Sequence, residues 1–299
     1  GANALDANTT ANGNTAVGKD ALSANQTGAT NTAVGFTSLA NNTASDNTAF
    51  GGFALAANTS GTRNVAVGLQ ALEANTTAND NTALGRQALQ TNTTGENNTA
   101  IGKSSLTSNT TANNNTAVGT SALTANTTGA DNTACGSIAL DANTTGSTND
   151  AFGRNALGKN TTGSNNVALG NNSLSNNLTA DNNTAVGKSA LTLNTTGTSN
   201  VAVGVNSLGS NTTASNNTAV GKDALVSNTT GDSNTALGSL AAPSTSTANN
   251  CTAIGRSSLF DNTTGSDNTA VGKSALENNT TASLNTAVGS SALLANTTG

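Results

Sequence analysis

The sequence predicts an all-β fold, a β-solenoid of about eighteen coils, each with seventeen residues and two short strands. One repeat, Asn-Thr-Ala-Val-Gly-x-x-Ala-Leu-x-x-Asn-Thr-Thr-Gly-x-x, accounts for the whole chain. Its glycine recurs from Gly1 to Gly289, and only the interval from Gly35 to Gly51 is sixteen residues long instead of seventeen. Repeats that hold two helices need about 33 residues or more, so each unit is expected to form one β-coil. Repeat positions are numbered 1 to 17 from the asparagine.

Two apolar segments in each repeat are the expected strands. Thr-Ala-Val at positions 2–4 is rich in β-branched residues and favours a short strand, which the glycine at position 5 ends in a bend. The pair at positions 8 and 9, as in Ala88-Leu89 and Ala190-Leu191, is expected to form the second strand. Asn-Thr-Thr-Gly then makes the return turn, because asparagine and glycine tolerate positive φ.

The most constant positions predict the core. Position 4 is always apolar, and position 9 is leucine in every copy except at Ala242. We therefore expect two core columns, which include Val17, Leu22, Val67, Leu72, Leu89, Val118, Leu123, Val203 and Leu208. Because positions 2 and 4 share a face of a regular strand, Asp150 at position 2 would be a costly core residue. Cys135, at position 4, is expected to be a small core hydrophobe.

The alanine at position 3 occurs in every copy, as at Ala66 and Ala83. It marks either a tight core or a close contact between chains, so both residues are candidate chain-contact positions. Asparagine fills positions 1 and 12 in nearly every copy. Identical asparagines stacked in register form hydrogen-bonded amide ladders. The predicted ladders include Asn64, Asn75, Asn81, Asn92, Asn98 and Asn109.

A second period of thirty-four residues lies above the first. Position 15 alternates between alanine and glycine, and basic residues gather at position 6, mostly in repeats that follow an alanine at position 15. In the other repeats position 6 is often apolar, as at Phe36, Leu69 and Val205. The pattern has two explanations: a history of duplication in pairs, or contact of alternate coils with a neighbouring chain. Under the second explanation these three residues are candidate chain-contact positions.

Composition limits the chemistry. The chain has no histidine, so Ser-His and Cys-His nucleophile systems are excluded. Its carboxylates are scattered singly, and the spacings typical of calcium, zinc and phosphate sites are missing. We expect a protein that is not an enzyme, with no catalytic residue, no cofactor and no metal. A net charge of −5 without a basic run argues against nucleic acid as a partner, and no apolar stretch is long enough to span a membrane.

The chain as a whole, residues 1–299, is predicted to be a single repeat domain. Both ends cut through a repeat, so we expect a window of a longer repetitive chain. Cys135 and Cys251 lie seven repeats apart, which is too far for a disulfide within a stacked solenoid. An intermolecular bridge at Cys251 stays open.

The repeat resembles that of a known family. At residues 64–68 and 200–204, both Asn-Val-Ala-Val-Gly, it resembles the β-roll repeat in the heads of trimeric autotransporter adhesins (YadA-type). The whole chain is also similar to the Asn-Thr-Ala-Val-Gly-x-x-Ala-Leu repeats of phage tail-fibre-like proteins. The resemblance implies left-handed β-rolls, often three side by side, in a surface-exposed fibre.

These observations predict a structural rod of an extracellular fibre, filament or surface adhesin, on a cell or a virion. Its expected partner is itself, as a homotrimer or an end-to-end filament. The alternatives are a phage tail-fibre shaft and an adhesin head that binds a host surface or glycan, with Phe36, Phe53 and Phe260 as candidate contacts. Ice binding is a minor alternative, because adjacent threonines such as Thr76 and Thr77 would point to opposite faces of a strand.

Overall fold

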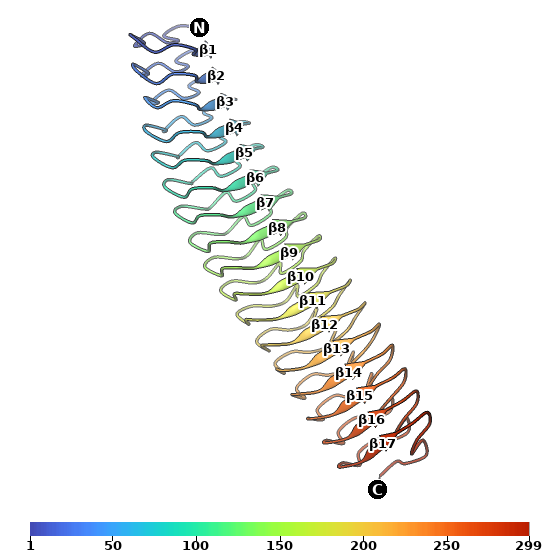
Figure 1. Ribbon diagram of the computed structural model, residues 1–299. Coiled ribbons are helices and arrows are strands. Elements are labelled where there is room, and N and C mark those ends of the chain that lie inside the picture. Colours follow the sequence, from blue (N-terminus) through green and yellow to red (C-terminus); the bar gives the residue numbers. More distant parts are fainter. Residues whose placement is uncertain (299) are drawn as a thin grey trace. The chain divides into compact units, whose positions relative to one another are not determined.

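The computed structural model describes residues 1–298, and the last residue of the expected repeat domain, Gly299, lies outside the described residues. Residues 1–149 and the residues from Asp150 onward form two compact units. Each unit is a stack of coils with one three-residue strand per coil, as Figure 1 shows. Unit 1 contains β1 (Thr15–Val17), β2 (Thr32–Val34), β3 (Thr48–Phe50), β4 (Val65–Val67), β5 (Thr82–Leu84), β6 (Thr99–Ile101), β7 (Thr116–Val118) and β8 (Thr133–Cys135). Unit 2 contains β9 (Asp150–Phe152), β10 (Val167–Leu169), β11 (Thr184–Val186), β12 (Val201–Val203), β13 (Thr218–Val220), β14 (Thr235–Leu237), β15 (Thr252–Ile254), β16 (Thr269–Val271) and β17 (Thr286–Val288).

Within each unit, consecutive strands pair in parallel and in register. Between β5 and β6, for example, Thr82 lies opposite Thr99 and Ala83 opposite Ala100. The same pairing joins β10 to β11 and each later strand to the next. Residues 1–298 form no helix. The predicted all-β solenoid with coils of about seventeen residues is therefore confirmed.

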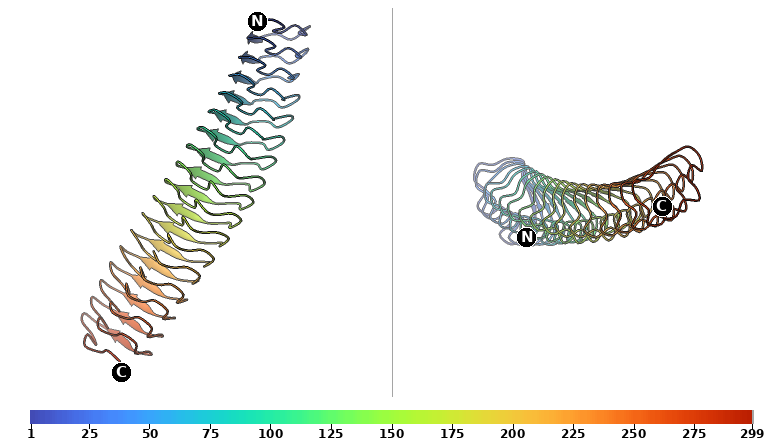
Figure 2. Two further views of the ribbon diagram at one scale, coloured as in Figure 1. Left: turned by 180° about the vertical axis from the view of Figure 1, so that it is seen from behind. Right: turned by 90° about the horizontal axis from the view of Figure 1, so that it is seen from below.

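The expected second strand in each coil is wrong. Ala-Leu at positions 8 and 9 lies in a run of turns, and the views in Figure 2 draw strands along only one side of the coils. The cause is the backbone: Gln87 has φ 61° and Leu89 has φ 51°, so left-handed residues flank Ala88 and prevent an extended strand. The segment still joins neighbouring coils, because the Leu89 N–H donates to the Ser105 carbonyl at 3.0 Å.

The leucine column is confirmed as the core. Leu22, Leu72, Leu89, Leu123 and Leu208 are all completely buried.

The valine column of the predicted core is wrong. Val17 is 56% exposed, and Val67, Val118 and Val203 are half-buried. Strand residues alternate between faces, and the asparagine at position 1 points inward to bond within its coil. Position 3 therefore also points inward and position 4 points outward. The inner column of the strand is the alanine column, whose small side chains fit the narrow space beside the leucines.

Three further expectations change because position 3 points inward and positions 2 and 4 point outward. Asp150 at position 2 is exposed, so it carries no burial cost. Cys135 at position 4 is exposed and is not a core hydrophobe. Ala66 and Ala83 are completely buried within their own chain, so neither is free to contact another chain. The invariant alanine marks a tight core.

The glycine at position 5 is required by the stacking of the coils. Gly119 has φ 136°, and a Cβ placed on it would lie 2.6 Å from the Gly136 carbonyl oxygen of the next coil. Any side chain would push adjacent coils apart and strain the backbone.

Candidate functional surfaces

The first of three polar ladders runs through position 12. The Nδ2 group of Asn92 donates to Asn75 Oδ1 at 3.1 Å, and Asn109 Nδ2 donates in turn to Asn92 Oδ1 at 2.8 Å. All three side chains are completely buried. Each amide therefore satisfies the next one in a place that water does not reach, which confirms the predicted ladder.

The second ladder runs through position 1. Asn64 Oδ1 accepts the backbone N–H of Asn81 at 3.0 Å, and Asn81 Oδ1 accepts that of Asn98 at 2.9 Å. The two ladders meet inside each coil, since Asn64 Nδ2 and Asn75 Nδ2 both donate to the Ala78 carbonyl, at 2.8 Å and 3.1 Å. One carbonyl thus joins the start of the strand to the return turn and closes the coil.

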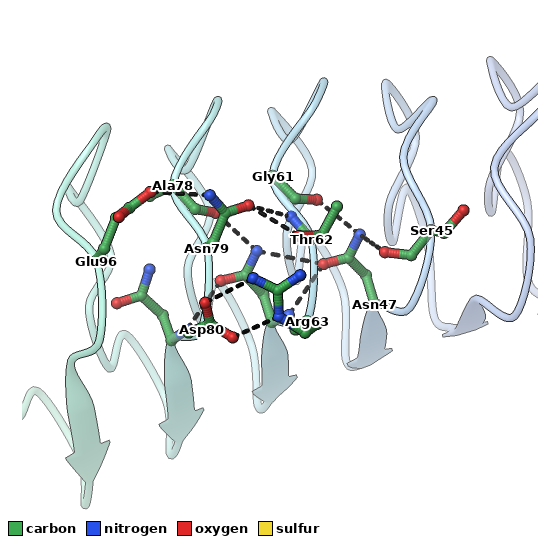
Figure 3. Close-up of polar contacts among 11 residues, drawn as sticks. Ser45, Asn47, Gly61, Thr62, Arg63, Ala78, Asn79, Asp80 and Glu96 are labelled. Carbon is green, nitrogen blue, oxygen red and sulfur yellow. Dashed lines mark hydrogen bonds and ion pairs between the residues drawn. The ribbon is translucent and has the colours of Figure 1, made fainter.

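A third ladder, at position 16, was not predicted. In Figure 3, Asn79 Oδ1 accepts the backbone N–H of Thr62 at 2.8 Å, and Asn79 Nδ2 donates to Glu96 Oε1 at 2.8 Å. In unit 2, Asp232 Oδ1 accepts the Ser215 N–H at 2.6 Å in the same way. A signal was present in the sequence, because position 16 is mostly Ser, Thr, Asn, Asp or Glu, the residues that accept backbone hydrogen bonds.

One ion pair lies beside this third ladder in unit 1. Arg63 Nε lies 2.6 Å from Asp80 Oδ1, and Arg63 Nη2 lies 2.8 Å from Asp80 Oδ2, as Figure 3 shows. The guanidinium lowers the pKa of Asp80 and the carboxylate raises the pKa of Arg63, chiefly through these hydrogen bonds. Both side chains are exposed, so solvent screens the pair and its contribution to stability is small.

Cys251 replaces an asparagine of the second ladder in unit 2. It is 2% exposed, its backbone N–H donates to Asn234 Oδ1 at 2.9 Å, and its Sγ donates to the Gly265 carbonyl at 3.2 Å. Burial raises the pKa of the Cys251 thiol. A thiol enclosed in this way is poorly placed to reach a second chain.

The outward-facing residues at positions 2 and 4 of the strands form what we call the sheet face of each unit. Position 2 is mostly threonine, and position 4 is mostly a larger apolar residue. The most exposed large side chains of this face are Val17, Phe50, Val65, Leu84 and Ile101 in unit 1 and Phe152, Val167, Leu169, Leu237 and Val288 in unit 2. An apolar column on the outside of a polar chain is the clearest candidate interaction surface that the structure offers.

The three candidate contacts at position 6 are exposed: Phe36 by 46%, Leu69 by 46% and Val205 by 41%. Phe36 meets Phe53 edge to face, with ring centroids 5.2 Å apart, and Lys19 Nζ lies 5.8 Å from the Phe36 ring centroid. Phe50, three residues before Phe53 in the sequence, is also exposed.

Within residues 1–298, no three His, Cys, Asp or Glu side chains are grouped so that they could share a metal ion. None of the described residues belongs to a helix long and apolar enough to cross a membrane.

No protein-family model matches the chain. A search of curated proteins finds no match to it either.

Proposed function

We propose that this protein is a non-enzymatic structural rod of an extracellular fibre or surface adhesin, which assembles through protein–protein contacts. The observation that carries the proposal is the repetition of one bonding scheme in coil after coil, with parallel pairing and buried asparagine ladders. Stability in such a stack grows by nearest-neighbour addition, so repeats lengthen the particle without changing its surface. That property suits a spacer or shaft.

The resemblance to the heads of trimeric autotransporter adhesins and to phage tail-fibre-like repeats supports a location on a cell surface or a virion. It also supports self-association, as a homotrimer or an end-to-end filament, and left-handed coils. The exposed apolar column of the sheet face supports a protein partner, since such a column gains from burial.

One observation favours a second candidate function, an adhesin head that binds a glycan or host surface. Phe36 and Phe53 are exposed in unit 1 with their rings in contact, and aromatic rings are common contacts for ligands with apolar faces. Phe260, the third residue named from the sequence, is only half-exposed and lies in unit 2, apart from this cluster in the sequence.

Sedimentation velocity of the purified chain over a wide concentration range tests the rod proposal, together with electron microscopy of the same samples. We expect concentration-dependent association into elongated particles that resist prolonged protease treatment. A chain that stays monomeric at every concentration, or that is digested quickly, would contradict the proposal. Glycan-array binding that disappears in Phe36→Ala but not in Phe260→Ala would favour the adhesin head instead.

A further inference from the structure

We infer that the sheet face of unit 2 binds the same face of a second copy of the chain, with the two chains running parallel. This inference rests on the proposed self-assembling function and specifies the contact surface and its orientation. The strands β9–β17 lie along one side of the unit (Figure 1). Their outward position 4 is a continuous apolar column: Phe152, Leu169, Val186, Val203, Val220, Leu237, Ile254, Val271 and Val288.

This column is unusual for a water-facing surface of such a chain. Only 8% of the residues are charged and 2% are aromatic, yet one column collects large apolar side chains in register. Leu169 is 48% exposed and Leu237 is 47% exposed. No packing inside the unit accounts for them, because the core is formed by positions 3 and 9. Burial against another apolar surface would remove this area from water.

The two edges of the face carry opposite charge. The turn after the strands presents exposed basic residues at position 6: Arg154, Lys188, Lys222, Arg256 and Lys273. The turn before the strands presents acidic residues at positions 16 and 17: Asp181, Asp232 and Asp267. Neither edge carries a residue of the wrong sign at these positions within the described part of unit 2. Asp223 at position 7 partly offsets the basic edge, since it lies 3.3 Å from Lys222 Nζ.

The charge asymmetry selects the orientation of the pair. If a two-fold axis runs along the solenoid axis, the chains are parallel and the strand direction reverses across the interface. The basic edge of one copy then lies against the acidic edge of the other. If the axis runs along the strands, the chains are antiparallel and like-charged edges meet. Only the parallel arrangement is electrostatically complementary.

Side-chain size selects the same orientation. In the parallel pair, position 4 of one copy lies opposite position 2 of the other, because the strands run in opposite directions. Bulky residues such as Leu169 then face the smaller threonine and valine column, as at Thr184 and Val201. The antiparallel pair would place bulky residues against each other. Asp150, at position 2 of β9, is the one acidic residue on the face itself and lies at its first strand.

The area fits a reversible contact. Nine strands spaced by about 4.8 Å give a face about 40 Å high, and the width from position 2 to position 6 is about 15 Å. The buried area is then on the order of 600 Å² per copy, near the lower end for specific interfaces, which bury about 800 Å² per partner. We therefore expect association that depends on concentration rather than a permanent dimer.

Sedimentation equilibrium of the full chain tests the face. The test variant is Leu169→Lys with Leu237→Lys, and the matched control is Leu193→Lys, a residue 46% exposed at position 11, outside the strands. We expect the test variant to raise the dissociation constant by about tenfold or more, and the control to stay within about twofold of the parent chain. Circular dichroism checks that both variants are folded. Higher salt should weaken the parent dimer, because it screens the charged edges.

Distances between spin labels, measured by double electron–electron resonance, test the relative orientation of the two chains. Spin labels are placed at Lys159→Cys or Asn278→Cys, two exposed position-11 residues near opposite ends of unit 2, in a chain that also carries Cys135→Ser and Cys251→Asn. Parallel packing predicts that two labels at the same site lie closer together across the dimer than labels at the two different sites. A shorter distance between the different sites overturns the parallel arrangement.

The outcomes separate the two proposals. Association of the parent chain with no effect of Leu169→Lys and Leu237→Lys overturns the sheet-face contact and leaves the structural rod standing. A monomeric parent chain contradicts the rod proposal and the contact together. If that monomer binds alginate, and Lys188→Gln with Lys222→Gln abolishes the binding, the basic edge serves an acidic polysaccharide instead, which also overturns the contact.

Discussion

Asn228 and Thr245 occupy consecutive rungs of the position-12 ladder, and neither Asn228 Oδ1 nor Thr245 Oγ1 has a hydrogen-bond partner although both are buried. Thr245 stands where nearly every other coil has asparagine. Its short hydroxyl does not replace the amide, which elsewhere donates to the preceding rung, as Asn211 Nδ2 does to Asn194 Oδ1 at 2.8 Å. The ladder is therefore broken at one coil of unit 2.

A similar break lies between the short repeat in unit 1 and the coil before it. Asn25 Oδ1 is also buried without a partner, and the coil after it is the one with sixteen residues. In that coil Asn42 Nδ2 donates to Ala44 O at 2.7 Å and makes no bond to Asn25. Unsatisfied amides thus mark the places where the repeat is irregular.

We predict that Thr245→Asn stabilises the protein. The new amide would donate to Asn228 Oδ1 and accept from Asn262 Nδ2, so the unpartnered Asn228 oxygen would gain a donor and the unpartnered Thr245 hydroxyl would be removed. Satisfying a buried group is worth about 1–3 kcal/mol. Denaturant unfolding followed by circular dichroism measures the change, and hydrogen exchange of the adjacent coils localises it.

The reverse substitution is the matched control. Asn211→Thr creates the same break in an intact coil and should destabilise the protein by a similar amount. If Asn211→Thr is neutral, the ladder does not stabilise the fold.

We predict that enlarging an inward-facing strand residue costs more stability than shortening its outward-facing neighbour. Ala117 is completely buried, so Ala117→Val should overpack the coil and cost about 1–3 kcal/mol. Its neighbour Val118 is half-buried on the outer face, and Val118→Ala should cost less than about 1 kcal/mol. Thermal unfolding at low protein concentration, where chains are separate, compares the two. A larger cost for Val118→Ala would show that position 4, not position 3, faces the core.

The two cysteines should differ in reactivity. Cys135 is exposed on the sheet face, whereas Cys251 is enclosed and burial raises the pKa of its thiol. Iodoacetamide should therefore alkylate Cys135 in the folded protein and reach Cys251 only after unfolding, because the thiolate is the reactive form. Mass spectrometry of the digested protein gives the label at each site, with a sample alkylated in denaturant as the control. Equal labelling of both sites in the folded state would contradict this placement.

The sequence predicted the coil, its period and two ladders, because each depends on what a repeated residue must do in every copy. A buried asparagine needs a partner, and an identical asparagine one coil away supplies it. Which side of the strand faces the core was not predictable from apolarity alone, because alanine and valine both suit a core. What decides it is the inward bond of Asn64 to the Ala78 carbonyl, a contact across the coil.

The missing second strand has a similar cause. Leucine at position 9 gives no sign of a left-handed backbone, yet Leu106 has φ 51°. Packing in the core outweighs the local preference of the residue. Position 7 did carry a signal, since Asp20, Asn155 and Asn206 are residues that tolerate positive φ.

Replacing Asp141 or Asp80 by asparagine should change the stability at neutral pH in opposite directions. Burial raises the pKa of Asp141, so the folded state holds this proton to higher pH than the unfolded state does. Its contribution to stability therefore falls as pH rises from the unfolded value of about 3.9 through the raised folded pKa. Asp141→Asn removes this cost, and we expect the variant to be more stable than the parent at neutral pH.

Asp80→Asn is the opposing control. Arg63 lowers the pKa of Asp80, so this carboxylate stabilises the fold above its unfolded pKa and loses the effect as pH falls through the folded pKa. Asp80→Asn should be slightly less stable than the parent at neutral pH, and salt should shrink the difference because the pair is exposed. Both variants should approach the parent in acid, where the two carboxyls are protonated. Unfolding midpoints measured from acid to neutral pH test this, and a loss of stability in Asp141→Asn at neutral pH would refute the burial argument.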